Sequence, residues 1–348
     1  FNSRLTGTID AYWNTTKDLL MKTAIPGITG FTSTYANVGQ TSNKGIEIAL
    51  QGVLVKTRDW NVTAGFNINF NRGKVDKLAD NVTGLYGTEW ATSSTFPKSD
   101  YVLKEGRPVG LVRGLTADGF YTTDDFTYEN GVYTLKEGVA DVSSAVFPNY
   151  HLHNGMNERP AGQLAYPGMA KFKDLNDDGI INDDDVDVIG DMTPVHTGGF
   201  NINATYKNFD LGLYFNWSYG NEIYNVNKLA ALYGYKEGAV YENKLSIVKD
   251  CYKIYDVVNG ELVALTTPEQ LNAANANAKL PLAYSENGYV STLGIEDGSY
   301  LRLNTLTLGY TLPKSMLQKA GISNLRVYGS IYNVFTITGY SGIDAEVS

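Results

Sequence analysis

Cysteine is almost missing from this chain: Cys251 is the only one in 348 residues. A single thiol excludes an intrachain disulfide, a zinc site built from several cysteines and a redox CxxC pair. Histidine is nearly as scarce, with three copies, and none belongs to a pattern that joins a nucleophile, a base and an orienting group. The sequence therefore assigns no catalytic residue, and we do not expect an enzyme.

Long apolar runs and clusters of positive charge are missing as well. The longest apolar runs are a handful of residues, whereas a membrane-spanning helix needs about 18 or more. The formal net charge is −9 and no face rich in lysine and arginine is visible, so we expect no nucleic-acid partner. No hydrophobic signal segment opens the chain, and Phe1 already lies in a strand-like pattern. We therefore expect the chain to be a piece of a longer protein.

What the chain does have is the composition of β-structure. It holds 25 tyrosines, 13 phenylalanines and 36 glycines, and aromatic residues are enriched in strands. Apolar and polar residues alternate strictly in the stretch WNVTAGFNINFN at 60–71, which is the pattern of a strand with one apolar face. The same alternation predicts strands at 4–14, 44–55, 60–71, 198–206, 209–219, 299–311 and 325–335. In 299–311 the apolar phase switches, which predicts a bulge near Asn304.

The length of these strands and the chemistry of their polar face favour a membrane protein. They run about 9–12 residues, which matches the ~9–11 that a tilted strand needs to cross a bilayer and exceeds the ~5–6 typical of soluble sheets. The polar face presents asparagine, threonine, aspartate and arginine to the expected interior. The predicted fold class is all-β: a transmembrane antiparallel β-barrel with long extracellular loops. An ordinary soluble antiparallel sheet with one wet face is the competing interpretation.

The connections between the predicted strands alternate between long and short. The long ones are 15–43, 72–197 and 220–298, and the short ones are 56–59, 207–208 and 312–323. A transmembrane barrel has this asymmetry, with tight periplasmic turns and large outer loops, whereas a structureless insertion of such size is unusual in a soluble domain. We therefore expect 72–197 and 220–298 to be long extracellular loops, and 312–323 to be a periplasmic turn with a short helix.

One acidic stretch has the spacing of a calcium-binding loop. The sequence DLNDDGIINDDD at 174–185 fits the pattern DxNxDGxIxxxD, in which oxygen ligands alternate and a glycine permits a sharp bend. The expected ligands are Asp174, Asn176, Asp178, the carbonyl of Ile180, Asn182 and Asp185. The predicted ion is a structural Ca²⁺ that braces the loop, since no amphipathic helices flank the motif as they would in a sensor. An Asp/Asn-rich turn without an ion is the alternative.

Several phrases of the chain occur together, and in the same order, in one family of membrane transporters. They are TGTIDAYWNTTKDLL (6–20), NVGQTSNKGIEIAL (37–50), KFKDLNDDGIINDDDVDVIG (171–190), TGGFNINATYKNFDLGLYFNWSYGNEIYN (197–225), EDGSYLRLNTLTLGYTLPKS (296–315) and NLRVYGSIYNVFTITGYSGIDAEVS (324–348). Over essentially its whole length the chain resembles the C-terminal third of SusC/RagA-like TonB-dependent outer-membrane transporters. Six phrases in the right order make this resemblance far more specific than any single motif.

The resemblance implies a fold and a set of partners. Family members form a plugged barrel of about 22 strands, so residues 1–348 would be the C-terminal portion of the barrel and supply about seven strands. Such transporters are energised through the TonB complex, and a SusD-like surface lipoprotein covers the barrel and captures glycans or peptides. The chain departs from a complete member because it has no plug domain or TonB-contacting region and stops after DAEVS.

The function expected from these observations is TonB-dependent import of a glycan or an oligopeptide across the outer membrane, where the chain forms a multi-pass β-barrel in contact with lipid. The alternative is a surface adhesin or a secreted Ca²⁺-binding β-protein that transports nothing, and a passive porin is a third, weaker interpretation. Loop aromatics such as Tyr86 and Tyr121 are candidates for stacking on sugars; the competing interpretation is that they only pack the loop. No substrate-binding residue is assigned.

Overall fold

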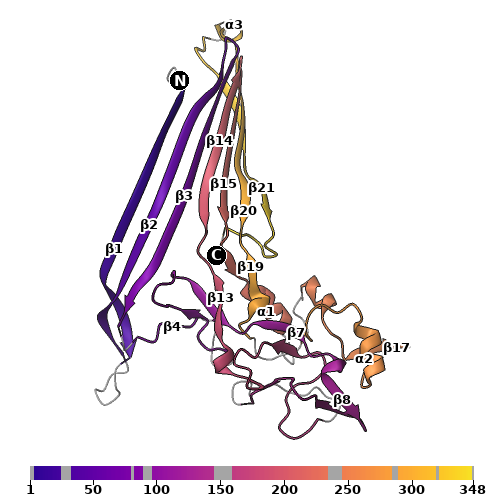
Figure 1. Ribbon diagram of the computed structural model, residues 1–348. Helices are drawn as coiled ribbons and strands as arrows, with labels where there is room; N and C mark the ends of the chain where they lie inside the picture. The colour runs from indigo at the N-terminus through magenta and orange to yellow at the C-terminus, as the bar shows by residue number, and fades with distance from the viewer. Residues whose placement is uncertain are drawn as a thin grey trace.

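The computed structural model of the chain describes residues 4–24, 33–79, 82–88, 96–144, 159–233, 245–283, 289–318 and 321–346. Within these ranges the largest sheet is antiparallel and has seven strands in the order β1-β2-β3-β14-β15-β20-β21. They are β1 (Leu5–Ala24), β2 (Ser33–Lys56), β3 (Trp60–Leu78), β14 (His196–Tyr206), β15 (Phe209–Tyr219), β20 (Tyr300–Thr311) and β21 (Arg326–Thr338). Figure 1 shows this sheet as a tall, twisted wall with a lobe of short strands and helices at one end.

The alternation of apolar and polar residues is what builds the wall. Directly paired residues of neighbouring strands point to the same face, so the apolar residues form rows across the sheet, and Phe200 and Phe215 stack with ring centroids 4.3 Å apart. The hairpin between β14 and β15 turns at Lys207 and Asn208, and Lys207 adopts the positive φ of +51° that a two-residue turn requires. The seven strands predicted from the alternation are confirmed.

The bulge predicted near Asn304 is also present. Tyr214 and Phe215 are adjacent in β15, but their partners in β20 are Thr305 and Leu303, which leaves Asn304 as an extra, unpaired residue. The extra residue resets the alternation, so the leucines on both sides of it lie on one apolar face although their spacing in the sequence differs.

The first three strands run further than predicted. β1 continues to Ala24 and β2 begins at Ser33, so most of the segment 15–43, predicted as a loop, is strand. The prediction was wrong because Asp18 takes a φ of +57° and the register shifts on both sides of Leu19, and such a bulge interrupts the regular alternation that marks a strand. β3 is likewise paired with β2 up to its last residue.

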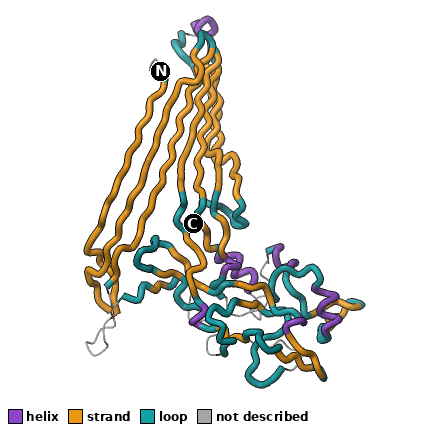
Figure 2. The backbone as a smooth tube through the Cα atoms, in the orientation of Figure 1, coloured by secondary structure: helices purple, strands orange, loops and turns teal. Residues whose placement is uncertain are grey.

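The short connections gather at the end of the sheet opposite the lobe. The N–H of Lys207 donates to the carbonyl of Asp59, and the N–H of Thr311 donates to the carbonyl of Asn208, both at 2.8 Å. The turn at 312–323 begins with the short helix α3 (Lys314–Leu317), which Figure 2 places at the same end. Among the described residues, no helix is long and apolar enough to span a membrane.

Two segments far apart in the sequence form the lobe. Its strands are β4 (Leu85–Tyr86), β5 (Tyr101–Val102), β6 (Leu111–Gly114), β7 (Ala117–Phe120), β8 (Phe126–Glu129), β9 (Val132–Leu135), β10 (Asp141–Val142), β11 (Ala170–Phe172), β12 (Ile180–Ile181), β13 (Asp187–Asp191), β16 (Glu222–Tyr224), β17 (Tyr255–Val258), β18 (Glu261–Ala264) and β19 (Ile295–Asp297), and its helices are α1 (Val226–Tyr233) and α2 (Pro268–Asn275). The lobe contains a four-stranded sheet, β13-β6-β5-β4, and several two-stranded ones. The segments predicted as two loops, 72–197 and 220–298, therefore supply this lobe, apart from the residues at 72–78 and 196–197 that belong to β3 and β14.

The lobe has a hydrophobic core to which both segments contribute. The N–H of Leu115 donates to the carbonyl of Val290 at 2.9 Å, and the N–H of Thr292 donates to the carbonyl of Leu115 at 3.1 Å. Tyr121 and Tyr133 are completely buried in this core. Tyr121 therefore packs the lobe and is not accessible to a sugar, so the competing interpretation holds for this residue.

Candidate functional site

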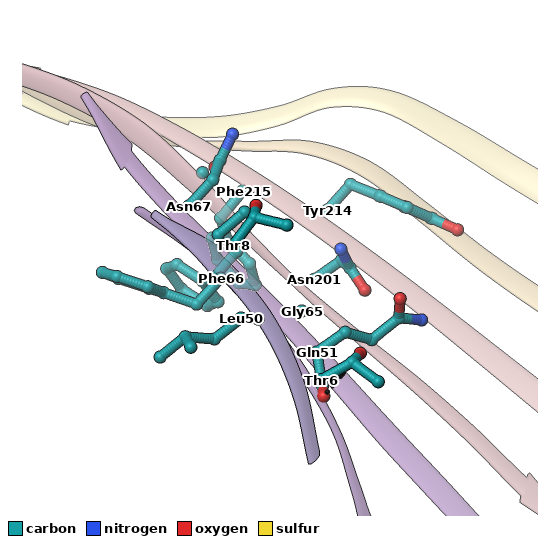
Figure 3. A pocket seen from close by; sticks show the side chains of 14 residues that line it. Thr6, Thr8, Leu50, Gln51, Gly65, Phe66, Asn67, Asn201, Tyr214 and Phe215 are labelled. Atoms are coloured by element: carbon teal, nitrogen blue, oxygen red, sulfur yellow. Dashed lines mark hydrogen bonds between the residues drawn. The ribbon is translucent and has the colours of Figure 1, made fainter. Parts of the chain in front are cut away.

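The two faces of the seven-stranded sheet differ sharply in chemistry. On one face, Thr6, Gln51, Gly65, Asn201 and Tyr214 lie in one row across five strands. Figure 3 shows the side chains of this row around a shallow hollow of about 570 Å³. No residue that lines the hollow is charged, and Leu50, Phe66, Phe200 and Phe215 of the opposite face also contribute to its lining. Its polar side chains are hydroxyls and carboxamides, which both donate and accept hydrogen bonds.

Close packing of small and polar residues fixes the carboxamides of this face. A side chain at Gly65 would bring its Cβ within 2.6 Å of the amide nitrogen of Asn201, so glycine makes room for that amide. The amide of Asn203 donates to Oδ1 of Asn201 at 3.1 Å, and the hydroxyl of Tyr214 donates to Oδ1 of Asn203 at 3.2 Å. The polar groups are thus held in place along the wall by their own contacts.

The opposite face is apolar and exposed. Ile9 and Trp13 are 74% and 79% exposed. Exposed large apolar side chains continue across the wall from β1 to β21; these include Leu5, Ile46, Leu50, Phe66, Phe209, Leu308, Val327, Ile331 and Ile337. A contiguous apolar surface of this extent is far larger than a monomeric soluble protein exposes to water. Lipid is the environment in which this face is stable.

Aromatic rows bound the apolar face at both ends. At the short-turn end Trp60 lies 4.5 Å from Tyr206, ring centroid to ring centroid, and at the lobe end Phe70 lies 5.6 Å from His196. Ten residues of β3 separate the rows, which is about 33 Å along a strand and about 25 Å after the tilt usual in membrane barrels. This height matches the apolar band of an outer-membrane barrel.

Residues 339–346, here called the strap, fold back from β21 onto the polar face. Arg302 of β20, which is only 6% exposed, forms ion pairs with Asp344 and Glu346, the latter at 2.6 Å. At the other end of the strap, Glu296 accepts hydrogen bonds from the N–H and hydroxyl of Ser341, both at 2.8 Å. The sequence analysis missed this arrangement, because Arg302 and Asp344 are 42 residues apart and no local pattern links them.

The charges of the strap favour its docked state. The backbone N–H of Glu346 and the guanidinium of Arg302 hold the pKa of Asp344 below its usual range. Burial tends to raise the pKa of Glu296, but the bonds from Ser341 and the ammonium of Lys228 at 2.9 Å outweigh burial and leave it lowered. Both carboxylates are therefore ionised at neutral pH and bound by donors.

The structure brings three of the six predicted calcium ligands into one turn. Asp174 accepts the N–H groups of Asp178 at 3.2 Å and Gly179 at 2.7 Å. Asn176 donates its amide to Asp178 at 2.9 Å, and Asp178 in turn accepts the N–H of Ile180 at 2.8 Å. Two carboxylates and an amide oxygen on one tight turn are a hard-oxygen donor set, which fits Ca²⁺.

The other predicted ligands hold the loop closed. Asp185 is fully buried and accepts the N–H groups of Leu175 at 2.7 Å and Asn182 at 2.8 Å. Asn182 caps the 3₁₀ turn that follows, by accepting the N–H of Asp184, and the carbonyl of Ile180 accepts the amide of Asn182 at 3.3 Å. In the part of the chain that the structure describes, no three histidine, cysteine, aspartate or glutamate side chains are grouped closely enough to hold a metal.

No family model matches the chain, but several known proteins do. TonB-dependent receptor P3 of Formosa agariphila is 30% identical over 351 residues, which cover 100% of this chain and 29% of that protein. TonB-dependent receptor SusC of Bacteroides thetaiotaomicron is 27% identical over 354 residues, which cover 99% of this chain and 28% of SusC. The chain thus spans less than a third of the length of the curated relatives that it matches.

The same match is found in three dimensions. A solved structure of the RagAB peptide transporter superimposes on the chain with a TM-score of 0.68 at 24% identity, over 100% of this chain and 31% of that one. The open seven-stranded sheet therefore has the fold of part of a TonB-dependent barrel wall. The alternation predicted a transmembrane barrel, and the resemblance predicted the TonB-dependent kind. The chain is homologous over its whole length to part of the TonB-dependent receptors, SusC among them.

Proposed function

We propose that the chain is part of an outer-membrane importer, energised through TonB, that takes up glycans or oligopeptides. The observation that carries this proposal is the pairing of faces on one sheet: an exposed apolar face suited to lipid, and a polar face with an uncharged hollow suited to a solute. SusC and RagAB add support, since relatives of this fold are receptors and a peptide transporter. A surface lipoprotein like the partner of SusC-type receptors is the proposed lid.

The donor and acceptor groups of the hollow suit either class of solute. Asn201, Gln51 and Tyr214 present amides and a hydroxyl, which pair equally well with sugar hydroxyls and with peptide bonds. Charged side chains are missing from its lining, so a neutral backbone or sugar ring is favoured over a fixed charge on the solute.

The test is uptake by the intact parent protein in its own cells. We expect deletion of its gene to abolish uptake of one class among labelled oligosaccharides and oligopeptides, and a protonophore, which removes the TonB energy source, to do the same. In the complemented strain, Asn201→Leu is expected to raise the half-saturating solute concentration about two- to tenfold, because one hydrogen bond is lost. Thr205→Val, four residues along the same polar face and outside the hollow, is the matched control.

Two results would contradict the proposal. Uptake that persists unchanged without the gene would show that this protein does not transport the solute. Recovery of the intact protein from the aqueous fraction without detergent would favour the adhesin or secreted protein instead. Uptake that continues in the presence of the protonophore would not depend on TonB, and would indicate a passive porin.

We further propose that the turn at 174–185 binds a structural Ca²⁺ through Asp174, Asn176, Asp178, the carbonyl of Ile180, Asn182 and Asp185. Support comes from the two carboxylates and the amide oxygen that share one turn. When bound, the ion would supply positive charge to these oxygens and brace the segment that leads into β13 and β14.

Calcium titration of the intact protein tests this site. We expect bound Ca²⁺ to slow hydrogen exchange in 171–190, and Asp178→Asn to weaken binding at least about tenfold because a carboxylate ligand is lost. Asp177→Asn is the matched control, since Asp177 lies in the same turn with a φ of +59°, which asparagine tolerates, and is outside the ligand set. If Ca²⁺ did not change the hydrogen-exchange rate of 171–190 and released no heat of binding, the turn would be an acidic loop without an ion.

A further inference from the structure

The lobe end of the apolar face carries a cluster of cations. Lys44 and Arg72 are paired across β2 and β3, and Lys44 is also paired with Trp13 of β1. Lys44 lies two residues before Ile46 in β2, and Arg72 lies two residues after Phe70 in β3, so both point to the same face as the apolar side chains. The apolar face therefore changes from aliphatic to basic at this height.

These cations line one hollow. It measures about 720 Å³, and its lining includes Trp13 and four cations, which are Lys44, Arg72, Lys74 and Arg107. Asp191 is the single carboxylate of the lining. An anion that entered the hollow would meet positive charge from two strands and from the loop that contains Arg107.

Most of this positive charge has no carboxylate beside it. Arg72 donates to the backbone carbonyls of Pro194 at 2.9 Å and Val195 at 3.2 Å, which hold the guanidinium in place without neutralising it. Lys74 pairs with a carboxylate, Asp76 at 3.1 Å. Within the described ranges, neither Lys44 nor Arg72 forms an ion pair.

The height of the cluster is set by the strand geometry. From the aromatic residue Trp60 at the short-turn end to Arg72 is twelve residues of β3, or about 40 Å along the strand and about 30 Å after the usual tilt. A hydrocarbon core is about 30 Å thick. The cations therefore lie level with the headgroups of the leaflet on the lobe side, while Trp13 lies where interfacial aromatics are found.

We propose that this hollow binds the phosphate of an anionic lipid headgroup in the leaflet on the lobe side. The proposal rests on the proposed function, because it needs the apolar face to be in a membrane. A free anion in water is a weaker candidate, since the cations of the hollow lie on the apolar face and Trp13, which also lines the hollow, is 79% exposed. A lipid molecule carries a phosphate together with acyl chains, and the acyl chains would cover the exposed apolar side chains of the same face.

Lipid binding to the intact parent protein, purified in an uncharged detergent, tests the proposal. Native mass spectrometry would follow titration with lipid A or phosphatidylglycerol, with phosphatidylcholine as the lipid of no net charge. We expect the double variant K44Q/R72Q to bind the anionic lipids roughly tenfold to thirtyfold more weakly, because each cation near a membrane surface contributes about 1 kcal/mol, which is about fivefold in affinity. The charge-conserving variant K44R/R72K is expected to retain binding.

The matched control is K56Q/R58Q. Lys56 and Arg58 belong to the same β2–β3 hairpin and are exposed, but they lie at the opposite membrane surface. Equal loss of lipid in both double variants, or none in K44Q/R72Q, would overturn the proposal. Inorganic phosphate that displaces the lipids at millimolar concentration would assign the hollow to soluble anions and would overturn it too. Each of these results leaves the import test unaffected, so the two proposals fail separately.

Discussion

Phe200→Arg is expected to destabilise the membrane-inserted protein by about 2–4 kcal/mol, the cost of a basic residue on the lipid face near the bilayer midplane. Phe200 is six residues from Tyr206 and four from His196 in β14, so it lies near the middle of the apolar face. The variant also loses the stacked contact with Phe215, which lies 4.3 Å away between ring centroids; such pairs contribute about 0.5–1.5 kcal/mol.

Asn201→Arg is the matched control for this variant. It introduces the same side chain one residue along, on the polar face, where water solvates the charge. Reversible unfolding of the intact protein in lipid vesicles by guanidinium would measure both free energies of unfolding. If Asn201→Arg were as destabilising as Phe200→Arg, or more so, the assignment of the two faces would be wrong.

Arg302→Gln is expected to release the strap and to raise hydrogen exchange in 339–346 about thirtyfold or more. Removing one member of a fully buried ion pair costs about 3–5 kcal/mol, and the partly exposed carboxylates here reduce that to about 2–3 kcal/mol. Asp344 and Glu346 are 32% and 41% exposed, against 7% for Arg302. Without the guanidinium the two carboxylates repel each other at short range.

Arg326→Gln is the control, because it removes a similar pair from an exposed place. Nε of Arg326 donates to Asp210 at 2.9 Å, with the side chains 38% and 29% exposed, and such pairs contribute about 0.2–1 kcal/mol. Hydrogen exchange in the intact protein would report both variants. Unchanged exchange of the strap in Arg302→Gln would show that the ion pairs do not hold it.

Acid gives a second readout of the same contact. The pKa of Asp344 is lowered in the folded protein, so its contribution is present above the unfolded pKa of about 3.9 and is lost as the pH falls below it. Exchange of the strap should therefore be constant from neutral pH down to about pH 5, after correction for the intrinsic rate, and should rise below about pH 4.

The seven strands and their two faces were predictable because their signal is local. A strand with one apolar face alternates whatever its partner is, and the switch of phase around Asn304 showed the bulge before any pairing was known. The ends of β1 and β2 were not predictable, because Asp18 and the shifts around Leu19 hide the alternation and only the partner strand shows that pairing continues.

The side-chain contacts of the site could not be predicted from the sequence, for a different reason. Arg302 and Asp344 are forty-two residues apart, and nothing in the composition of either segment says that they meet. The turn at 174–185 was recognisable by its spacing, yet the burial of Asp185 and its bonds to Leu175 depend on the lobe around it. Tyr121 illustrates the same limit, because its role as a core residue follows from neighbours in both segments.

The lobe with its single core has a consequence for how such receptors can be recombined. The β3–β14 connection and the β15–β20 connection both contribute buried residues to that core, and backbone hydrogen bonds from Leu115 to Val290 and from Thr292 to Leu115 join them. A chimera that received only one connection from a relative would expose the apolar core residues of the other to water. The two connections attach to the wall at four strand ends, so we expect a chimera to fold with an intact lobe only when both connections are exchanged together.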